Sequence, residues 1–259
     1  MNKIIRGKAA TLSRRKFVIG SAAAGGGLAL GFNLPSGFGA AMAQGAASNG
    51  SEVNVWVAIK PDDTCVIRIA RSEMGQGTLT GLAQLVAEEL ECDWHKVSTE
   101  FASPNEHIKR KRIWGSMSTG GSAGIRTSQE YLRKSGAAAR EMLVSAAATQ
   151  WNVPAGECTV ANGVISHAKS KRKTSYGKVA EAAGKLEAPK EPKLKDPKDW
   201  KIAGQSVPRL EMPDKVLGKP VFGVDVQLPG MLHASIAQCP VFLGKVKSVD
   251  SAGRRRCAA

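Results

Sequence analysis

The sequence has few residues of the kinds that hold a metal ion. Its five cysteines are spread over 259 residues without a C-x-x-C pair, and its four histidines form neither an H-E-x-x-H motif nor an i, i+4 pair. Zinc sites and iron–sulfur clusters need closely spaced cysteine or histidine ligands. We therefore expect no metal site formed by the side chains of this chain alone.

The common phosphate-binding motifs are also missing. The sequence contains no G-x-x-x-x-G-K-S/T P-loop and no G-x-G-x-x-G fingerprint within a βαβ unit. Both motifs bind nucleotide phosphates through backbone N–H groups at the start of a helix. The glycine-rich segments that the chain does contain therefore belong to neither class.

No apolar run is long enough for a permanent membrane span. The run Phe17–Phe32 is shorter than the roughly 20 residues that a bilayer requires, and glycines dilute it. A twin-arginine pattern at Ser13–Ile19 precedes it, and the small residues Ala41–Ala43 follow as a cleavage site. We predict a twin-arginine signal peptide over residues 1–43 and export, already folded, by the twin-arginine translocase to the periplasm. The alternative is a flexible tail with a chance arginine pair.

Acidic residues are outnumbered, with 22 Asp+Glu against 37 Lys+Arg. The first 43 residues contribute six basic residues and no acidic one. The densest basic run in the rest of the chain is Lys109–Arg112. Such runs can bind nucleic acid, but a run of four is typical of a solvated turn, and an exported protein rarely meets nucleic acid. We therefore expect no nucleic-acid partner.

The remaining sequence mixes strand and helix patterns, with no internal repeat and no strict βαβ alternation. Apolar residues alternate over residues 53–59 and recur over 64–70, which predicts a β-hairpin across the intervening K-P-D-D turn. Helical spacing predicts helices over residues 79–90 and 123–149, the second with Ser122 as its N-cap. Shorter elements are predicted as a strand over 96–102, a polar loop over 104–114, a hairpin across Asn162–Gly163 and a helix over 175–186. The predicted fold class is α+β.

Composition divides the chain into segments. After the signal peptide we predict a tether over 44–51, a first domain over 52–184, a Lys/Pro-rich surface linker over 185–207, renewed strand patterning over 208–250 and an atypical basic tail over 251–259.

Two glycine-rich segments each stand just before a predicted helix. One is E-M-G-Q-G, Glu73–Gly77, and the other is G-S-M-S-T-G-G-S, Gly115–Ser122. Glycines let backbone N–H groups approach an anion, and a helix N-terminus adds partial positive charge. One such segment is more often a plain connection than a binding site. Two of them about forty residues apart, in a chain exported folded, favour a binding site.

These two segments, in this order and behind this leader, resemble the molybdopterin-binding large subunit of the xanthine oxidase/aldehyde oxidase family, closest to the isoquinoline 1-oxidoreductase β-subunit type. Residues 218–236 resemble the opening of that family's hammerhead domain, and the resemblance covers nearly all of residues 51–250. It implies a molybdopterin-binding domain at 52–184 and the start of an α/β hammerhead domain at 208–250.

The resemblance also implies roles for individual residues. The Gln76 amide would donate a hydrogen bond to an oxo ligand of molybdenum, with Gly75 and Gly77 allowing a close approach. Phosphate and pterin groups would be held by backbone N–H groups and hydroxyls of Ser118, Thr119, Gly120, Gly121 and Ser122. The metal would be bound by the cofactor's dithiolene, so no protein residue is expected to ligate it.

The activity that the resemblance implies is the water-dependent oxidation of an aldehyde or an N-heterocyclic aromatic. The cofactor would be molybdenum–molybdopterin in its cytosine dinucleotide form, inserted with the help of a chaperone. Electrons would pass to a small partner subunit with 2Fe–2S clusters. A general base is needed, and in the family it is a Glu in a far C-terminal G-x-G-E segment. That segment has no counterpart here, and Glu73 is not expected to replace it.

The family-like pattern stops after Asp250, and the chain stops at Ala259. A premature stop, a frameshift or an incomplete gene would produce such a tail. We therefore expect an N-terminal fragment that does not turn over substrate alone. Two alternatives stay open: a non-catalytic fragment or binding module that no longer holds the cofactor, and an unrelated exported α+β protein.

Overall fold

The computed structural model describes residues 50–236 and 238–249. The predicted signal peptide over 1–43 and the predicted tail over 251–259 lie outside the described residues. Strands and helices are mixed within this part, which confirms the predicted α+β class. None of its helices is both long and apolar enough to cross a membrane.

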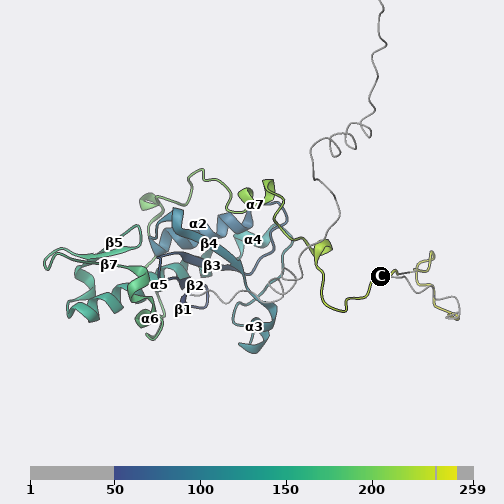
Figure 1. The fold of residues 1–259 in the computed structure, drawn as a ribbon, viewed down its shortest axis with the longest axis horizontal. Helices are drawn as coiled ribbons and strands as arrows, with labels where there is room; N and C mark the ends of the chain where they lie inside the picture. Colours follow the sequence, from purple (N-terminus) through teal and green to yellow (C-terminus); the bar gives the residue numbers. More distant parts are fainter. Residues whose placement is uncertain (1–49, 237, 250–259) are drawn as a thin grey trace, which may run out of the picture.

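A four-stranded sheet with the order β1-β2-β3-β4 lies at the centre of the fold (Figure 1). Its strands are β1 (Ser51–Asn54), β2 (Val57–Ile59), β3 (Cys65–Ile69) and β4 (Val97–Phe101). The first three pair antiparallel, whereas β4 runs parallel to β3. A parallel neighbour requires a crossover connection, and helix α2 (Thr78–Leu90) provides it.

Three helices form the core with this sheet. Helix α5 (Gln129–Trp151) packs against both α2 and α6 (Tyr176–Ala183), and all three contact strands. The approach of α5 to α2 depends on Gly136, because a Cβ at this position would lie 2.6 Å from the carbonyl oxygen of Val86. The resulting core is made mostly of aliphatic side chains and alanines, with the aromatic side chains of Trp56, Trp114 and Tyr176 among them.

A second, three-stranded antiparallel sheet lies at one end of the fold (Figure 1). Its strands are β5 (Cys158–Ala161), β6 (Val164–His167) and β7 (Arg172–Ser175). The turn at Asn162–Gly163 has φ values of 49° and 72°. Both lie in the left-handed region that two-residue hairpin turns require, which confirms the predicted hairpin. Strand β7 was not predicted.

The predicted strand over residues 53–59 is wrong in one respect, because the structure divides it into β1 and β2. The side-chain oxygen of Asn54 accepts hydrogen bonds from the N–H groups of Trp56 and Val57, at 3.0 Å each. Asparagine side chains make such local turns readily. The turn reverses the chain, so that Ser51 pairs with Ile59.

The predicted helix over residues 123–149 is also interrupted. It is replaced by the short α4 (Ala123–Arg126) and the long α5, with a break at Thr127–Ser128. Ser122 precedes α4, but it has φ 52° and its side chain makes no capping hydrogen bond. Ser122 therefore occupies the predicted N-cap position, but without the side-chain hydrogen bond that a capping serine usually makes. The break has a structural reason, since both of its hydroxyls accept hydrogen bonds from a distant arginine described below.

The remaining short elements are α3 (Pro104–Lys109), α7 (Met212–Val216) and 3₁₀ turns at Trp94–Lys96, Ala155–Glu157, Pro197–Asp199 and Gly223–Asp225. Helix α3 corrects the prediction of a polar loop over 104–114. Its start follows known rules, because Pro104 opens the first turn and the hydroxyl of Ser103 accepts a hydrogen bond from the N–H of Glu106.

The strands predicted over residues 208–250 are not found in the described part of this range. After α7 comes a segment made of residues 218–236 and 238–249. It contains only the short turn at Gly223–Asp225. Its apolar side chains are open to solvent, with Val224 92% and Leu232 91% exposed. A strand needs a neighbour that satisfies its backbone N–H and C=O groups, and none of the described strands pairs with this segment.

Residues 193–211 run back along α2 in the opposite direction, and we call them the α2 strap (Figure 1). The buried carboxylate of Glu88 accepts hydrogen bonds from the N–H groups of Lys201, Ile202 and Ala203 and from the Lys195 ammonium group. Further contacts follow at the N-terminal end of α2, where the Thr80 hydroxyl accepts from the N–H of Leu210 at 3.0 Å. Much of the segment predicted as a linker over 185–207 is thus fastened to α2.

Candidate functional site

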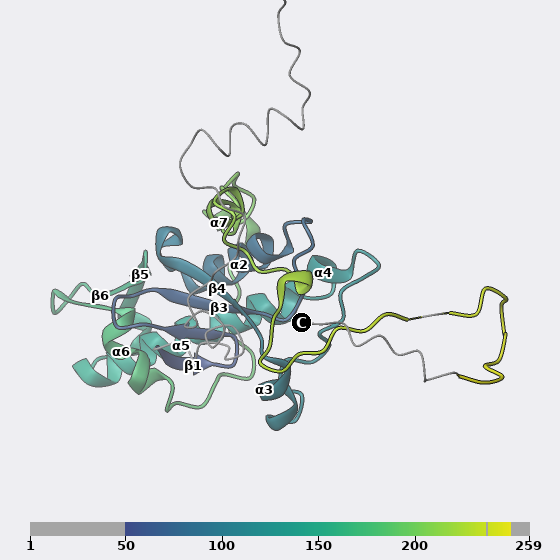
Figure 2. The same cartoon turned by 45° about the vertical axis from the view of Figure 1, so that its right-hand side comes forward.

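The two glycine-rich segments are neighbours in the structure. The Gln76 loop (residues 72–77) connects β3 to α2, and the Ser118 loop (residues 115–122) leads into α4. Helix α4 lies beside the start of α2 (Figure 2). The N–H of Ser72 donates a hydrogen bond to the Thr119 hydroxyl at 2.9 Å. This bond joins the two loops across 47 residues of sequence.

Arg71, the residue before the Gln76 loop, binds the Ser118 loop and the break between α4 and α5. Its side chain is buried, with 5% of the residue exposed. The guanidinium group donates to the carbonyl of Ser118, to the Ser128 hydroxyl at 2.9 Å and to the Thr127 hydroxyl at 3.1 Å. Sequence reasoning did not select Arg71. The one feature of the sequence that could have indicated Arg71 is its position, as a positively charged residue between a buried strand and a glycine-rich loop.

The charge of Arg71 has no carboxylate beside it. All three acceptors of its guanidinium group are neutral, and among the described residues no Asp or Glu forms an ion pair with it. A buried charge is costly unless it is paired. The junction of the two loops therefore has an uncompensated positive charge, which favours an anionic ligand.

The Gln76 side chain is exposed but held in one orientation. Its amide oxygen accepts a hydrogen bond from the N–H of Met74 at 2.5 Å, and its amide nitrogen donates to the carbonyl of Ser72 at 2.7 Å. These two hydrogen bonds determine which of the two terminal atoms of the side-chain amide is the nitrogen and which is the oxygen. A glutamine amide has two N–H donors, so one N–H is left for a ligand.

The backbone of both loops depends on glycine. Gly75, Gly77, Gly115 and Gly121 have φ values of 101°, 82°, 66° and 56°, a region that side chains disfavour. A Cβ added at Gly75, Gly115, Gly120 or Gly121 would meet no atom within 4 Å, so this backbone faces open space. The N–H groups of Gly120, Gly121 and Ser122 donate no hydrogen bond within the described part of the chain.

The N-terminus of α2 is already occupied by a carboxylate of the chain itself. Glu73 accepts hydrogen bonds from the N–H groups of Gly75 at 2.7 Å, Gly77 at 3.1 Å and Leu79 at 3.1 Å. The expected anion-binding role of the first glycine segment is therefore filled internally, and an external anion is more readily held by the Ser118 loop. The Glu73 carboxylate is thus engaged within its own loop.

Burial raises the pKa of Glu73, but the hydrogen bonds from Gly77, Leu79 and Gly75 outweigh burial and hold the pKa below the ordinary value of 4.5. Because this pKa is lowered on folding, the carboxylate stabilises the fold above pH 4.5. That contribution is lost as the pH falls below 4.5 through the folded-state pKa.

We therefore expect Glu73→Gln to flatten the fall of the free energy of unfolding between about pH 5 and pH 3. Urea titrations at several pH values measure this slope. Glu187→Gln is the matched control, because Glu187 is exposed and its carboxylate makes no hydrogen bond or ion pair within the described part of the chain. Its slope should match that of the unchanged chain. Equal slopes for Glu73→Gln and the unchanged chain would contradict the capping role.

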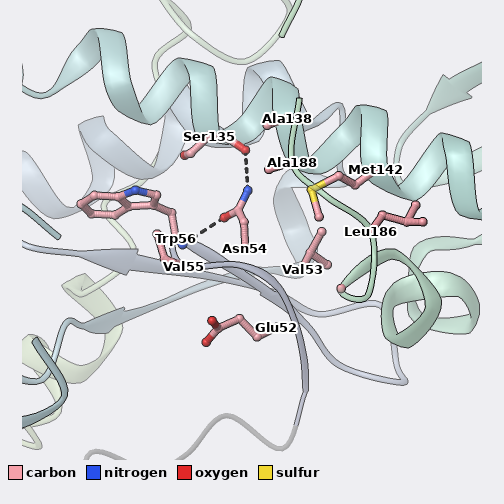
Figure 3. Close-up of a pocket in the computed structure, with 11 residues that line it drawn as sticks. Glu52, Val53, Asn54, Val55, Trp56, Ser135, Ala138, Met142, Leu186 and Ala188 are labelled. Atoms are coloured by element: carbon pink, nitrogen blue, oxygen red, sulfur yellow. Dashed lines mark hydrogen bonds between the residues drawn. The ribbon is translucent and has the colours of Figure 1, made fainter. Parts of the chain in front are cut away.

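Two clefts lie away from the two glycine-rich loops. One of about 400 Å³ lies between β1 and α5 (Figure 3). Among its polar side chains, Asn54 donates to the Ser135 carbonyl at 2.9 Å and accepts from Trp56, and Glu52 pairs with Arg68 and Arg110, so both are satisfied internally. The other, of about 230 Å³, is lined by residues that include Cys65, Cys92 and Lys96. None of the predicted site residues lines either cleft.

In this α+β domain, two glycine-rich loops meet at a buried arginine whose charge no carboxylate of the described residues compensates. This arrangement is suited to binding an anionic ligand. The model of the family "molybdopterin cofactor-binding domain" matches residues 8–224. The chain therefore belongs to this family, which confirms the resemblance to a molybdopterin-binding subunit.

The similar proteins are subunits or enzymes of greater length. The chain is 32% identical over 242 residues to the beta subunit of isoquinoline 1-oxidoreductase of Brevundimonas diminuta, covering 78% of this chain and 30% of that protein. It is 31% identical over 256 residues to the membrane-bound aldehyde dehydrogenase (pyrroloquinoline-quinone) of Gluconacetobacter polyoxogenes, covering 95% and 32%. A nicotinate dehydrogenase subunit of Pseudomonas putida KT2440 is 27% identical over 190 residues, covering 73% and 15%. The chain thus spans a third or less of the length of these relatives.

Proposed function

We propose that this chain is the molybdopterin-binding part of the large subunit of a molybdenum hydroxylase. The reaction class is oxidation of an aldehyde or an N-heterocyclic aromatic, with water as the source of oxygen. Membership of the molybdopterin cofactor-binding family and the names of the relatives support this class. The observation that carries the proposal is Arg71, a buried cation without a carboxylate at the junction of both loops.

The residues present fit such a cofactor. Its phosphate groups need N–H donors and positive charge, and the Ser118 loop supplies free backbone N–H groups above Arg71. The second N–H of Gln76 is a neutral donor, suited to an oxo ligand of an already anionic centre. When bound, the cofactor supplies the oxidation–reduction chemistry. The loop residues named here bind and orient the cofactor, and they fix the direction of the Gln76 N–H that faces it.

Several finer points complete the proposal. The cofactor is taken to be the cytosine dinucleotide form, inserted with a chaperone's help before folded export to the periplasm through the twin-arginine translocase. Electrons leave through a small partner subunit with 2Fe–2S clusters. The twin-arginine pattern at Ser13–Ile19 supports folded export, and the relatives named as subunits support a partner subunit. The dinucleotide form and the chaperone follow from the family resemblance alone.

The test is the cofactor content of the chain after expression with the molybdenum cofactor pathway and the small subunit. Elemental analysis and fluorescence of the oxidised pterin should show about one molybdenum and one pterin per chain. Gly121→Ala should lower both several-fold, because a side chain at φ 56° is strained. Gly156→Ala is the control, since a Cβ there meets no atom within 4 Å and the position lies in the 3₁₀ turn before β5, outside both loops. A chain purified without pterin would overturn the proposal and favour the binding-module alternative.

A further inference from the structure

The α2 strap ends with an arginine at the Gln76 loop. Arg209 donates from one terminal nitrogen to the carbonyl of Gly75 at 3.1 Å and from the other to the Glu73 carboxylate at 3.0 Å. A Cβ added at Gly77 would lie 3.8 Å from the second of these nitrogens, so the guanidinium group lies against the loop itself. The contacts span more than 130 residues of sequence.

A second residue of the α2 strap, Glu211, contacts the guanidinium group of Arg209. Its third nitrogen, Nε, is buried and lies 2.8 Å from a carboxylate oxygen of Glu211, an ion-pair contact whose angle does not form a hydrogen bond. Glu211 in turn accepts a hydrogen bond from the Thr80 hydroxyl at 3.1 Å. Arg209 therefore links the first turn of α2, the strap and the Gln76 loop.

The orientation of the Gln76 amide follows the backbone of this loop. Both of its hydrogen bonds are to main-chain groups of Ser72 and Met74, which stand on either side of Glu73. Arg209 binds the carboxylate of Glu73 and the carbonyl of Gly75. A shift of the loop that broke these contacts would also move both partners of the Gln76 amide.

We propose that Arg209 is a positioning residue for Gln76: it holds the Glu73–Gly77 turn so that the free amide N–H of Gln76 faces outward to the ligand. This inference rests on the proposed function for the identity of the ligand. The planar fork of arginine is needed, because it binds a carbonyl and a carboxylate at once, whereas lysine presents a single point charge.

The first experiment observes the Gln76 amide directly, without cofactor. The full chain is labelled with ¹⁵N-glutamine, and the side-chain signals of Gln76 are assigned with Gln76→Ala. In the unchanged chain the two amide protons should be well separated, and one should exchange slowly with solvent. Arg209→Met should raise the exchange rate about 10-fold and move both signals towards those of free glutamine, and Arg209→Lys should fall between.

Arg133→Met is the matched control. Arg133 also fastens the strap, through Glu89 and the carbonyl of Lys195, but it does not contact the Gln76 loop. It should leave the Gln76 signals unchanged. Circular dichroism verifies that each variant is folded. Unaltered Gln76 signals in folded Arg209→Met and Arg209→Lys would overturn the inference.

The second experiment separates the inference from the proposed function. Retention of molybdopterin by the loaded chain is measured as the rate of pterin release in Arg209→Met, Gln76→Ala and the double variant. If Arg209 acts through Gln76, its substitution should speed release about 10-fold alone and add nothing in the Gln76→Ala background. Additive effects would overturn the inference. A perturbed Gln76 amide in Arg209→Met together with no pterin in any chain would support the positioning role and overturn the proposed function.

Discussion

Arg71→Met should speed loss of the bound cofactor by 100-fold or more, with a smaller effect on folding. Hydrogen bonds to charged groups contribute about 1.5–3 kcal/mol each, and Arg71 makes three. Burying an unpaired cation, however, costs several kcal/mol, and the substitution removes that cost. We therefore expect the free energy of unfolding to fall by only about 1–3 kcal/mol. Cofactor retention should fall more, because the charge and the link between the loops are both lost.

The measurement is pterin release together with urea unfolding. Arg71→Lys keeps the charge but cannot reach three acceptors at once, so it should show an intermediate rate. Arg68→Met is the matched control: Arg68 stands on β3, three residues before Arg71, and pairs with Glu52 and Glu100. It should lower stability without speeding release. Equal release rates for Arg71→Met and Arg68→Met would refute the role given to Arg71.

Glu88→Ala should lower the free energy of unfolding by about 4 kcal/mol or more, a large effect for one residue. The carboxylate accepts hydrogen bonds from the N–H groups of Lys201 at 2.8 Å, Ile202 at 2.5 Å and Ala203 at 3.0 Å, and it pairs with Lys195. Each buried donor left without a partner costs about 1–3 kcal/mol. The strap should therefore separate from α2 at this point.

Urea unfolding measures the loss of stability, and limited proteolysis within residues 193–211 measures detachment of the strap. Glu130→Ala is the control, because Glu130 is 76% exposed and pairs only with Lys134. Exposed pairs contribute less than about 1 kcal/mol, so this variant should match the unchanged chain. Proteolysis of Glu88→Ala at the unchanged rate would show that the strap is held elsewhere.

Elements with strong local signals could be predicted from the sequence. Apolar residues at helical spacing predicted α2, and Asn162–Gly163 predicted the hairpin between β5 and β6. Failures occurred where a side chain competes with the periodic pattern. The turn made by Asn54 divides an apparently continuous strand, and the hydroxyls of Thr127 and Ser128 break an apparently continuous helix to bind Arg71.

The candidate site shows the same division. The sequence by itself determined the α+β class, the two glycine-rich segments and the family, because turns, periodicity and motifs depend on residues close together in the chain. Only the tertiary structure decided that Arg71 joins the two loops and that Arg209 returns to hold the Gln76 loop. Charged and polar partners 47 to 136 residues apart leave no periodic trace, since their pairing depends on how the folded chain brings them together.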